Sequence, residues 1–228
     1  MTQNKNTDRP VVAGVVRNRR LSDQIYDLLL EQIRTCTYSL EDLITEPAIA
    51  KALSTSRTPV REALFRLASN GVLTERGRGY RLPVLSRSDV TKLFSVRTMI
   101  ELEIIRLLGE LPWARELDDL RKFAGRERDA VNVDGAEKFV AANNAFREAL
   151  FSYCDNRYLV EIADMANDRM QAYRFMTLAK RKNRQVVADA HASVIVCLGE
   201  NDTDGAIIAY QAMMDSAVAA YADYSESD

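Results

Sequence analysis

Two helical runs on either side of a short polar turn organise the amino-terminal third of this 228-residue chain. The turn is Ser54-Thr55-Ser56, and apolar residues recur at helical spacing before and after it. Thr45-Glu46-Pro47 offers a capping threonine and a proline that a helix tolerates only in its first turn. Gly71 is a typical residue directly after a helix. The sequence therefore predicts a short helix ending near Leu53 and a second helix over residues 57–70.

An earlier helix and a later hairpin complete this unit. Apolar residues from Leu21 to Ile33 follow helical spacing, so we expect a helix there, before a loop over residues 35–42. Residues 72–76 and 80–84 are short strand candidates around Gly77-Arg78-Gly79, a sequence typical of a hairpin tip. Helix, short helix, turn, helix and hairpin is the order of a winged helix-turn-helix, a DNA-binding fold. We place this fold at residues 19–85.

The rest of the chain, residues 86–228, has helical spacing throughout and no alternating strand pattern. We predict an all-α bundle of about six helices there, which makes the whole chain mainly α. The helices are expected near residues 86–108, 113–131, 135–153, 156–179, 183–199 and 203–223. The polar residues 1–18 are expected to form a flexible tail.

Charge divides the chain in the same way as the helical pattern. Residues 1–88 contain 14 Lys and Arg against 9 Asp and Glu, whereas the remainder contains 17 against 24. A basic amino-terminal part fits a nucleic-acid-binding domain on an acidic body. The three cysteines form no CxxC pair, and no run of about 18 apolar residues occurs. We therefore expect a cytoplasmic protein with reduced thiols and no membrane span.

The amino-terminal end of the helix over residues 57–70 carries candidate DNA-reading residues. Arg57 and Arg61 can each bond a guanine edge in a bidentate fork, and Thr58 can bond a phosphate or a base. Arg66, further along, can reach a backbone phosphate. In the hairpin, Gly77 allows close backbone approach to DNA and Arg78 suits the minor groove. The alternative is that Arg57 and Arg61 lie on an ordinary solvated helix face.

A family resemblance favours the DNA-reading interpretation. The run from Thr55 to Leu67, TSRTPVREALFRL, followed by Asn70-Gly71-Val72-Leu73 and a glycine-bearing hairpin, resembles the GntR family of bacterial regulators. The helical remainder is similar to the FadR subfamily, whose carboxyl-terminal ligand-sensing domain is called FCD. The resemblance spans residues 20–223. It implies a homodimer that binds a palindromic operator and responds to a small metabolite.

The family pattern also has departures in this chain. Arg57, Thr58, Arg61 and Gly77 match positions at which the family contacts DNA. Pro47, however, stands where some members carry a DNA-contacting arginine, and the loop over residues 38–41 lacks the usual Pro-Gly. The operator sequence of the family is therefore not expected to transfer unchanged.

The resemblance also implies a metal site, and this sequence departs from it. FCD domains commonly hold a divalent metal through one Asp and three His. Asn143, Arg147 and Met213 fall at three of those positions, and His191, the only histidine of the chain, falls at the fourth. A guanidinium keeps its positive charge and repels a cation, and Met is a poor ligand for hard metals. We therefore expect no metal and no other cofactor.

The same residues predict a binding site for an anionic effector. Arg147 can form a fork with a carboxylate or phosphate, Asn143 and His191 can add hydrogen bonds, and Arg97 can join them. The alternatives are that Arg147 is buried against an acid or points to solvent, and that His191 is a structural histidine. Arg97 and Glu101 can equally form an (i, i+4) pair that only braces their helix.

Three functional hypotheses follow from the sequence. The first is a DNA-binding transcription regulator, most simply a repressor, controlled by a small carboxylate. The second is a ligand-independent regulator whose effector pocket has decayed. The third, an enzyme, lacks support, because a chain with one histidine and no phosphate-cradling glycine loop supplies no nucleophile with its base. We expect no enzymatic activity.

Overall fold

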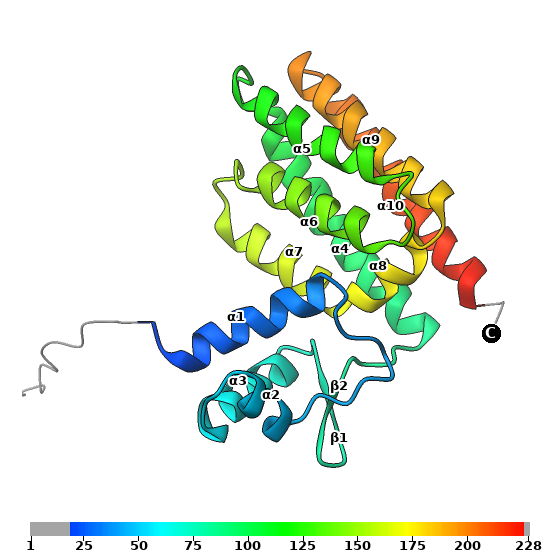
Figure 1. The fold of residues 1–228 in the computed structure, drawn as a ribbon. Coiled ribbons are helices and arrows are strands. Elements are labelled where there is room, and N and C mark those ends of the chain that lie inside the picture. Colours follow the sequence, from blue (N-terminus) through cyan, green and yellow to red (C-terminus); the bar gives the residue numbers. More distant parts are fainter. Residues whose placement is uncertain (1–18, 226–228) are drawn as a thin grey trace, which may run out of the picture.

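The computed structural model describes residues 19–225 and is mainly helical, with one small two-stranded sheet (Figure 1). The fold class predicted from the sequence is confirmed. The flexible tail expected at residues 1–18 lies outside the described residues. In chain order the elements are α1 Leu21–Arg34, α2 Glu46–Ala52, α3 Arg57–Ser69, β1 Thr74–Arg76, β2 Gly79–Arg81, α4 Arg87–Gly109, α5 Glu116–Ala130, α6 Glu137–Phe151, α7 Arg157–Arg169, α8 Gln171–Leu178, α9 Arg181–Gly199 and α10 Thr203–Ser225.

Elements α1 to β2 form the winged helix-turn-helix, which we call the head (residues 19–85). Thr45 caps α2 by accepting the Ala48 amide at 3.4 Å, and Pro47 lies in the first turn of that helix. Helix α3 begins at Arg57, directly after the turn at residues 54–56. Gly71 follows α3 with a φ of 72°, a left-handed conformation that favours glycine. The local signals in the sequence therefore predicted this part correctly.

The hairpin, or wing, is shorter than predicted. The strands pair with Arg76 opposite Gly79, which leaves Gly77 and Arg78 at the tip. Ile44 adds an unpredicted bridge to β2, with reciprocal backbone hydrogen bonds of 2.8 Å to Tyr80. A Cβ at residue 79 would lie 2.7 Å from the Ile44 carbonyl oxygen, so this close approach requires glycine. Backbone hydrogen bonds thus attach the wing to the loop before α2.

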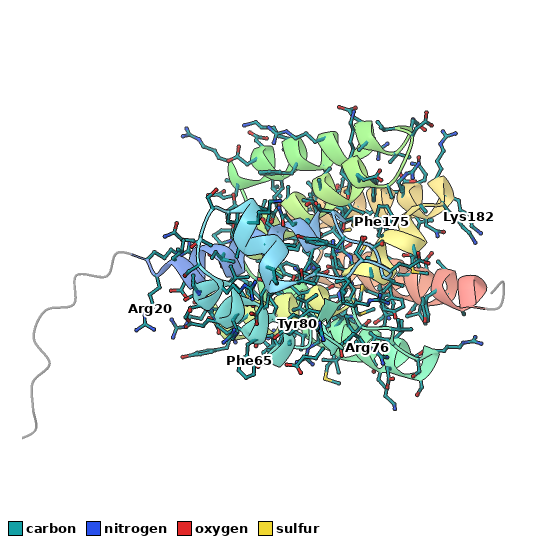
Figure 2. The ribbon with its side chains drawn as sticks, turned by 60° about the horizontal axis from the view of Figure 1, so that its bottom comes forward. Arg20, Phe65, Arg76, Tyr80, Phe175 and Lys182 are labelled. Carbon is teal, nitrogen blue, oxygen red and sulfur yellow. The ribbon has the colours of Figure 1, made fainter. Side chains whose placement is uncertain are left out.

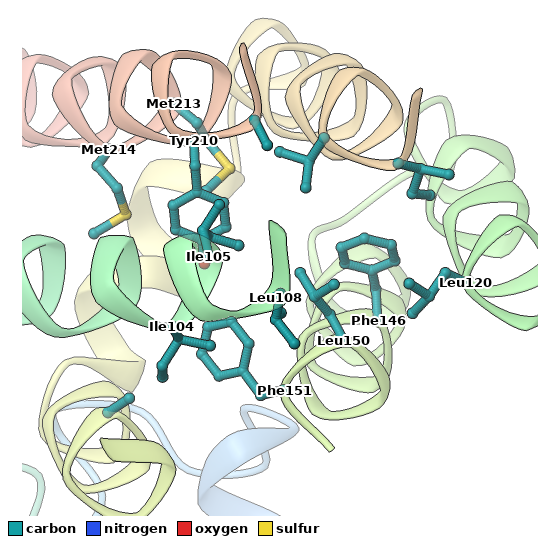
Figure 3. Packing of buried hydrophobic residues seen from close by; sticks show 14 of the residues in the cluster. Ile104, Ile105, Leu108, Leu120, Phe146, Leu150, Phe151, Tyr210, Met213 and Met214 are labelled. Carbon is teal, nitrogen blue, oxygen red and sulfur yellow. The ribbon is translucent and has the colours of Figure 1, made fainter. Parts of the chain in front are cut away.

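Helices α4 to α10 form a bundle, which we call the bundle (residues 86–225). Its core lies between α4, α6, α9 and α10, and Figure 3 shows Tyr210 of α10 beside Ile105 of α4. The helix expected at residues 156–179 is interrupted at Met170, which ends α7 and precedes α8. Apolar spacing continues across this break, so periodicity did not reveal it. No helix among residues 19–225 has the length and apolar character needed to cross a membrane.

Helix α1 lies between the rest of the head and the bundle (Figure 1). Near its carboxyl end, the Arg34 guanidinium bonds both carboxylate oxygens of Asp168 in α7, at 2.7 and 3.0 Å. Arg169 donates to the Asn70 carbonyl at 2.8 Å, directly after α3. The head is therefore held on the bundle by side chains of α7 as well as by α1.

Candidate functional site

The first turn of α3 presents two of the predicted DNA-reading residues to solvent. Arg57 and Thr58 are both exposed. Figure 2 views the molecule with the underside of the head turned forward, where Phe65 of α3 and Arg76 of β1 lie. A helix amino terminus also carries a partial positive charge that attracts phosphate. The geometry required of a recognition helix is thus present.

Arg61 and Arg66 have protein partners in addition to any role at DNA. The Arg61 guanidinium bonds both oxygens of Glu46 in α2 at 3.0 and 3.2 Å, while 66% of its side chain remains exposed. Arg66 pairs with Asp23 of α1 at 2.6 Å and lies over the Tyr26 ring at 4.4 Å. Glu46 therefore holds Arg61 from α2 while leaving most of its side chain exposed, and Arg66 braces α3 against α1.

The wing tip is open and positively charged. Gly77 has a φ of 58°, and no atom lies within 4 Å of the position that a Cβ would occupy. Arg78 beside it is exposed, as are Arg76 and Arg81 on the two strands. A tip of this kind can approach a phosphate or enter a minor groove.

The bundle contains a small cavity that faces three buried guanidinium groups, and we call it the arginine cavity. Its volume is about 50 Å³, which is room for a few water molecules. All four residues predicted to bind an effector, Arg97, Asn143, Arg147 and His191, line it. Arg174 of α8, which the sequence did not single out, lines it too. The other lining residues are Phe94, Thr177, Leu178, Val187, Tyr210, Met213, Met214 and Ala217.

One buried carboxylate holds two of the three arginines. Glu101, fully buried on α4, accepts from Arg97 at 3.0 and 3.2 Å and from Arg147 at 3.1 Å. Tyr210 donates to it at 3.0 Å. Burial alone raises the pKa of Glu101, but Arg97 and Arg147 outweigh that effect and hold the pKa at about 2. The predicted Arg97–Glu101 brace therefore exists, and its arginine lines the cavity.

Arg147 is buried against acids, one of the alternatives left open by the sequence, and it also keeps a group that is free to bind an anion. It is buried against acids, because its Nη1 also bonds Asp164 at 2.7 Å. Its Nη2, however, is buried without a hydrogen-bond partner among the described residues. An unsatisfied buried donor is costly, and it marks a place for an acceptor.

Arg174 is buried and has only neutral partners. Its guanidinium bonds the side-chain oxygens of Asn144 at 2.8 Å, Gln171 at 2.9 Å, and Asn143. Within residues 19–225, no carboxylate forms an ion pair with it. Burial, followed by the charges of Arg97 and Arg147, lowers the pKa of Arg174 to about 9, so it remains protonated at neutral pH. Glu101 attracts this positive charge through space without bonding it.

His191 is held in place by a second buried carboxylate. Its Nδ1 lies 2.9 Å from Glu127 of α5, whose other oxygen accepts from Asn143 at 2.7 Å. The imidazole stacks on Phe146 with 4.2 Å between ring centroids. The structural interpretation of His191 is therefore supported, although the ring also lines the arginine cavity. Glu127 was not identified from the sequence.

Residues 180–184 form a charged run at the start of α9, yet Arg184 is buried. It donates to the carbonyls of five residues around the start of α6 and the end of α8, a structural task that composition does not reveal. These residues are Val131, Val133, Gly135, Leu178 and Ala179.

The donors around the arginine cavity do not fit a divalent metal ion. The four residues at the family's metal positions do converge there, but Arg147 brings a fixed positive charge and Met213 a thioether. His191 and Asn143 already engage Glu127. Among residues 19–225, no group of three or more His, Cys, Asp or Glu is placed to hold a metal.

Known proteins resemble this chain over both parts. The sequence matches the family described as bacterial regulatory proteins, gntR family, over residues 21–81, and the FCD domain over residues 92–216. It is 25% identical over 174 residues to the HTH-type transcriptional regulator YdhC of Bacillus subtilis, covering 75% of this chain and 77% of that protein. It is 22% identical to the transcriptional repressor RspR of Escherichia coli, covering 81% of each. The structure of E. coli McbR/YncC has the same fold, with a TM-score of 0.81 at 21% identity, over 90% of this chain and 99% of that one.

Proposed function

Because the chain belongs to the gntR family of bacterial regulatory proteins and carries an FCD domain, we propose that it is a homodimeric repressor whose hold on a palindromic operator is controlled by a small carboxylate in the arginine cavity. Two heads related by a two-fold axis would read half-sites about 34–36 Å apart. The cavity guanidinium groups take the place of a metal ion, and the effector is bound without being chemically changed.

The guanidinium groups around the cavity are incompletely neutralised, and this is the observation that supports control by a carboxylate effector. Among the described residues, Arg174 has amide oxygens but no carboxylate as partners, and Arg147 keeps an unbonded Nη2. A carboxylate bonds a guanidinium through two parallel charge-assisted hydrogen bonds. Such a ligand supplies both the missing countercharge and the missing acceptor.

The size of the cavity supports a second candidate, a ligand-independent regulator with a decayed pocket. A volume of about 50 Å³ is far below that of usual ligand pockets, and Glu101 already pairs with Arg97 and Arg147. An effector must therefore displace side chains in order to enter. Met213 and Met214 line the cavity, and the unbranched chains of methionine readily change rotamer.

Thermal unfolding with a panel of anions separates the two candidates. The panel contains acetate, succinate, citrate, gluconate and inorganic phosphate, each also tested on the Arg147→Met protein. We expect at least one carboxylate to raise the melting temperature of the wild type, since a ligand at 100 times its Kd stabilises by about 2.7 kcal/mol. The Arg147→Met protein should lose that response.

The matched control is Arg128→Met, on the exposed surface of α5, where Arg128 pairs with Asp189 at 3.3 Å. This variant should respond like the wild type. If no anion stabilises the wild type, or if Arg147→Met responds fully, ligand control through the arginine cavity is wrong and the decayed-pocket candidate takes its place.

A further inference from the structure

We infer that Arg174 transmits occupancy of the arginine cavity to the head by controlling two side-chain amides that cap the end of α1. This inference rests on the proposed function, because it assigns the path by which an effector anion would act. It concerns Arg174, Asn144, Gln171 and the carbonyl of Arg34.

Arg174 bonds a residue of the arginine cavity on one side and, on the other side, two residues that contact helix α1 of the head. Its Nη2 donates to Asn143, which lines the cavity. Its Nη1 donates to Asn144 at 2.8 Å and to Gln171 at 2.9 Å, neither of which lines the cavity. One rigid, planar guanidinium therefore bonds two sets of partners, and it cannot move toward one set without leaving the other.

The two amides bonded by Nη1 turn their other ends toward α1. The Asn144 side-chain nitrogen donates to the Arg34 carbonyl oxygen at 3.1 Å, and the Gln171 side-chain nitrogen donates to the same oxygen. Arg34 is the last residue of α1, where helix carbonyls have no partner within the helix. Because an amide has a donor end and an acceptor end, bonding the oxygen to Arg174 directs the nitrogen toward α1.

An anion in the cavity would compete for the Arg174 guanidinium. A carboxylate adds a full negative charge and accepts two parallel hydrogen bonds from one guanidinium, which a neutral amide oxygen does not, and among the described residues Arg174 bonds only amide oxygens. As the guanidinium turns toward the anion, Asn144 and Gln171 lose the bonds that orient them, and the Arg34 carbonyl loses its two caps.

Helix α1 can convey this change to the DNA-reading helix. Ile25, Leu29 and Ile33 of α1 share one buried core with Leu64 and Leu67 of α3. The Arg34 guanidinium stays paired with Asp168 of α7, so the end of α1 remains attached while its capping changes. A reoriented α1 thus shifts α3 relative to the bundle, and with it the spacing of two heads in a dimer.

Hydrogen exchange tests the path without any effector. In wild-type protein, the amides of Thr35, Cys36 and Thr37 bond carbonyls of the last turns of α1. In Arg174→Met and in the double variant Asn144→Ala/Gln171→Ala, we expect these amides to exchange about tenfold faster, as the loss of two hydrogen bonds implies. Arg128→Met, on the exposed surface of α5, should exchange like the wild type. Unchanged exchange in both Arg174→Met and the double variant would overturn the inference.

A second measurement separates this inference from the proposed function, with citrate as the probe. In the wild type, we expect citrate to weaken binding to a selected DNA site by about 5- to 150-fold, a typical allosteric coupling. The Asn144→Ala/Gln171→Ala protein should bind citrate at least as tightly as the wild type by calorimetry, because Arg174 has no bonds to these two amides to give up, yet its DNA affinity should not change on adding citrate. If citrate still weakens DNA binding in this variant as in the wild type, the path through Arg174 is wrong although ligand control stands. If citrate does not bind the wild type, the result counts against ligand control by citrate, and the exchange experiment decides the inference.

Discussion

We expect the Glu101→Gln protein to lose about 3–5 kcal/mol of its free energy of unfolding, the usual cost of removing one partner from a buried ion pair. Glu101 accepts hydrogen bonds from Arg97, Arg147 and Tyr210 in the centre of the bundle. Without its charge, Arg97 retains no carboxylate partner among the described residues, and Arg147 retains only Asp164. Urea unfolding followed by circular dichroism measures the loss.

The pH dependence of unfolding gives this prediction a second readout. The pKa of Glu101 is about 2 in the folded chain, below its ordinary value of 4.5. A carboxylate with a depressed pKa stabilises the fold fully above the unfolded value, and that stabilisation is lost as the pH falls through the folded value. The difference between wild type and Glu101→Gln should therefore be constant above about pH 5 and shrink toward pH 2.

Glu103→Gln provides the control for the same helix. Glu103 pairs with Arg106 on the exposed face of α4, where ion pairs contribute little. We expect its unfolding curve to overlay that of the wild type. Equal stability of Glu101→Gln and Glu103→Gln would show that the buried ion pairs of Glu101 contribute no more to the free energy of unfolding than an exposed pair does.

Replacing Arg57 by alanine should weaken binding to the preferred DNA site by about 1–3 kcal/mol, or about 5- to 150-fold, the scale of a lost bidentate base contact. Arg57 is exposed in the first turn of α3, and within residues 19–225 it forms no ion pair that would hold it away from DNA. Because the operator is unknown, the site is first selected from a random duplex library by the wild-type protein.

The base preference of Arg57→Ala is as informative as its affinity. Repeating the selection with the variant should relax preference at one position of each half-site, whereas Arg128→Ala on the bundle should leave affinity and preference unchanged. If Arg57→Ala binds the selected site as tightly and as selectively as the wild type, α3 does not read bases through this residue.

The head could be predicted closely from the sequence because its signals are local. Thr45 as a cap, Pro47 in a first turn and Gly71 after a helix each act within a few residues of the structure that they specify. The bridge from Ile44 to the wing was missed because a single paired residue has no periodicity. The break at Met170 was missed because apolar spacing continues across it.

The arginine cavity could be predicted only in part. Asn143, Arg147 and His191 were found because they occupy the positions of a family ligand set, and Arg97 because it precedes Glu101 by one turn. Arg174 could not be found in this way, since its place at the cavity depends on how α8 packs after the break in the chain. The neutrality of its partners is likewise a property of the packing, and no spacing rule predicts it.

Fluorescence anisotropy with the selected DNA site measures whether an anion in the arginine cavity releases DNA. The carboxylate that raises the melting temperature most is titrated into the complexes of wild type and Arg147→Met. We predict that it weakens DNA binding by the wild type at least fivefold and leaves Arg147→Met unaffected, although both proteins bind DNA equally well without it. Equal DNA affinity of the wild type with and without a carboxylate that demonstrably binds the protein would show that the arginine cavity does not control DNA binding.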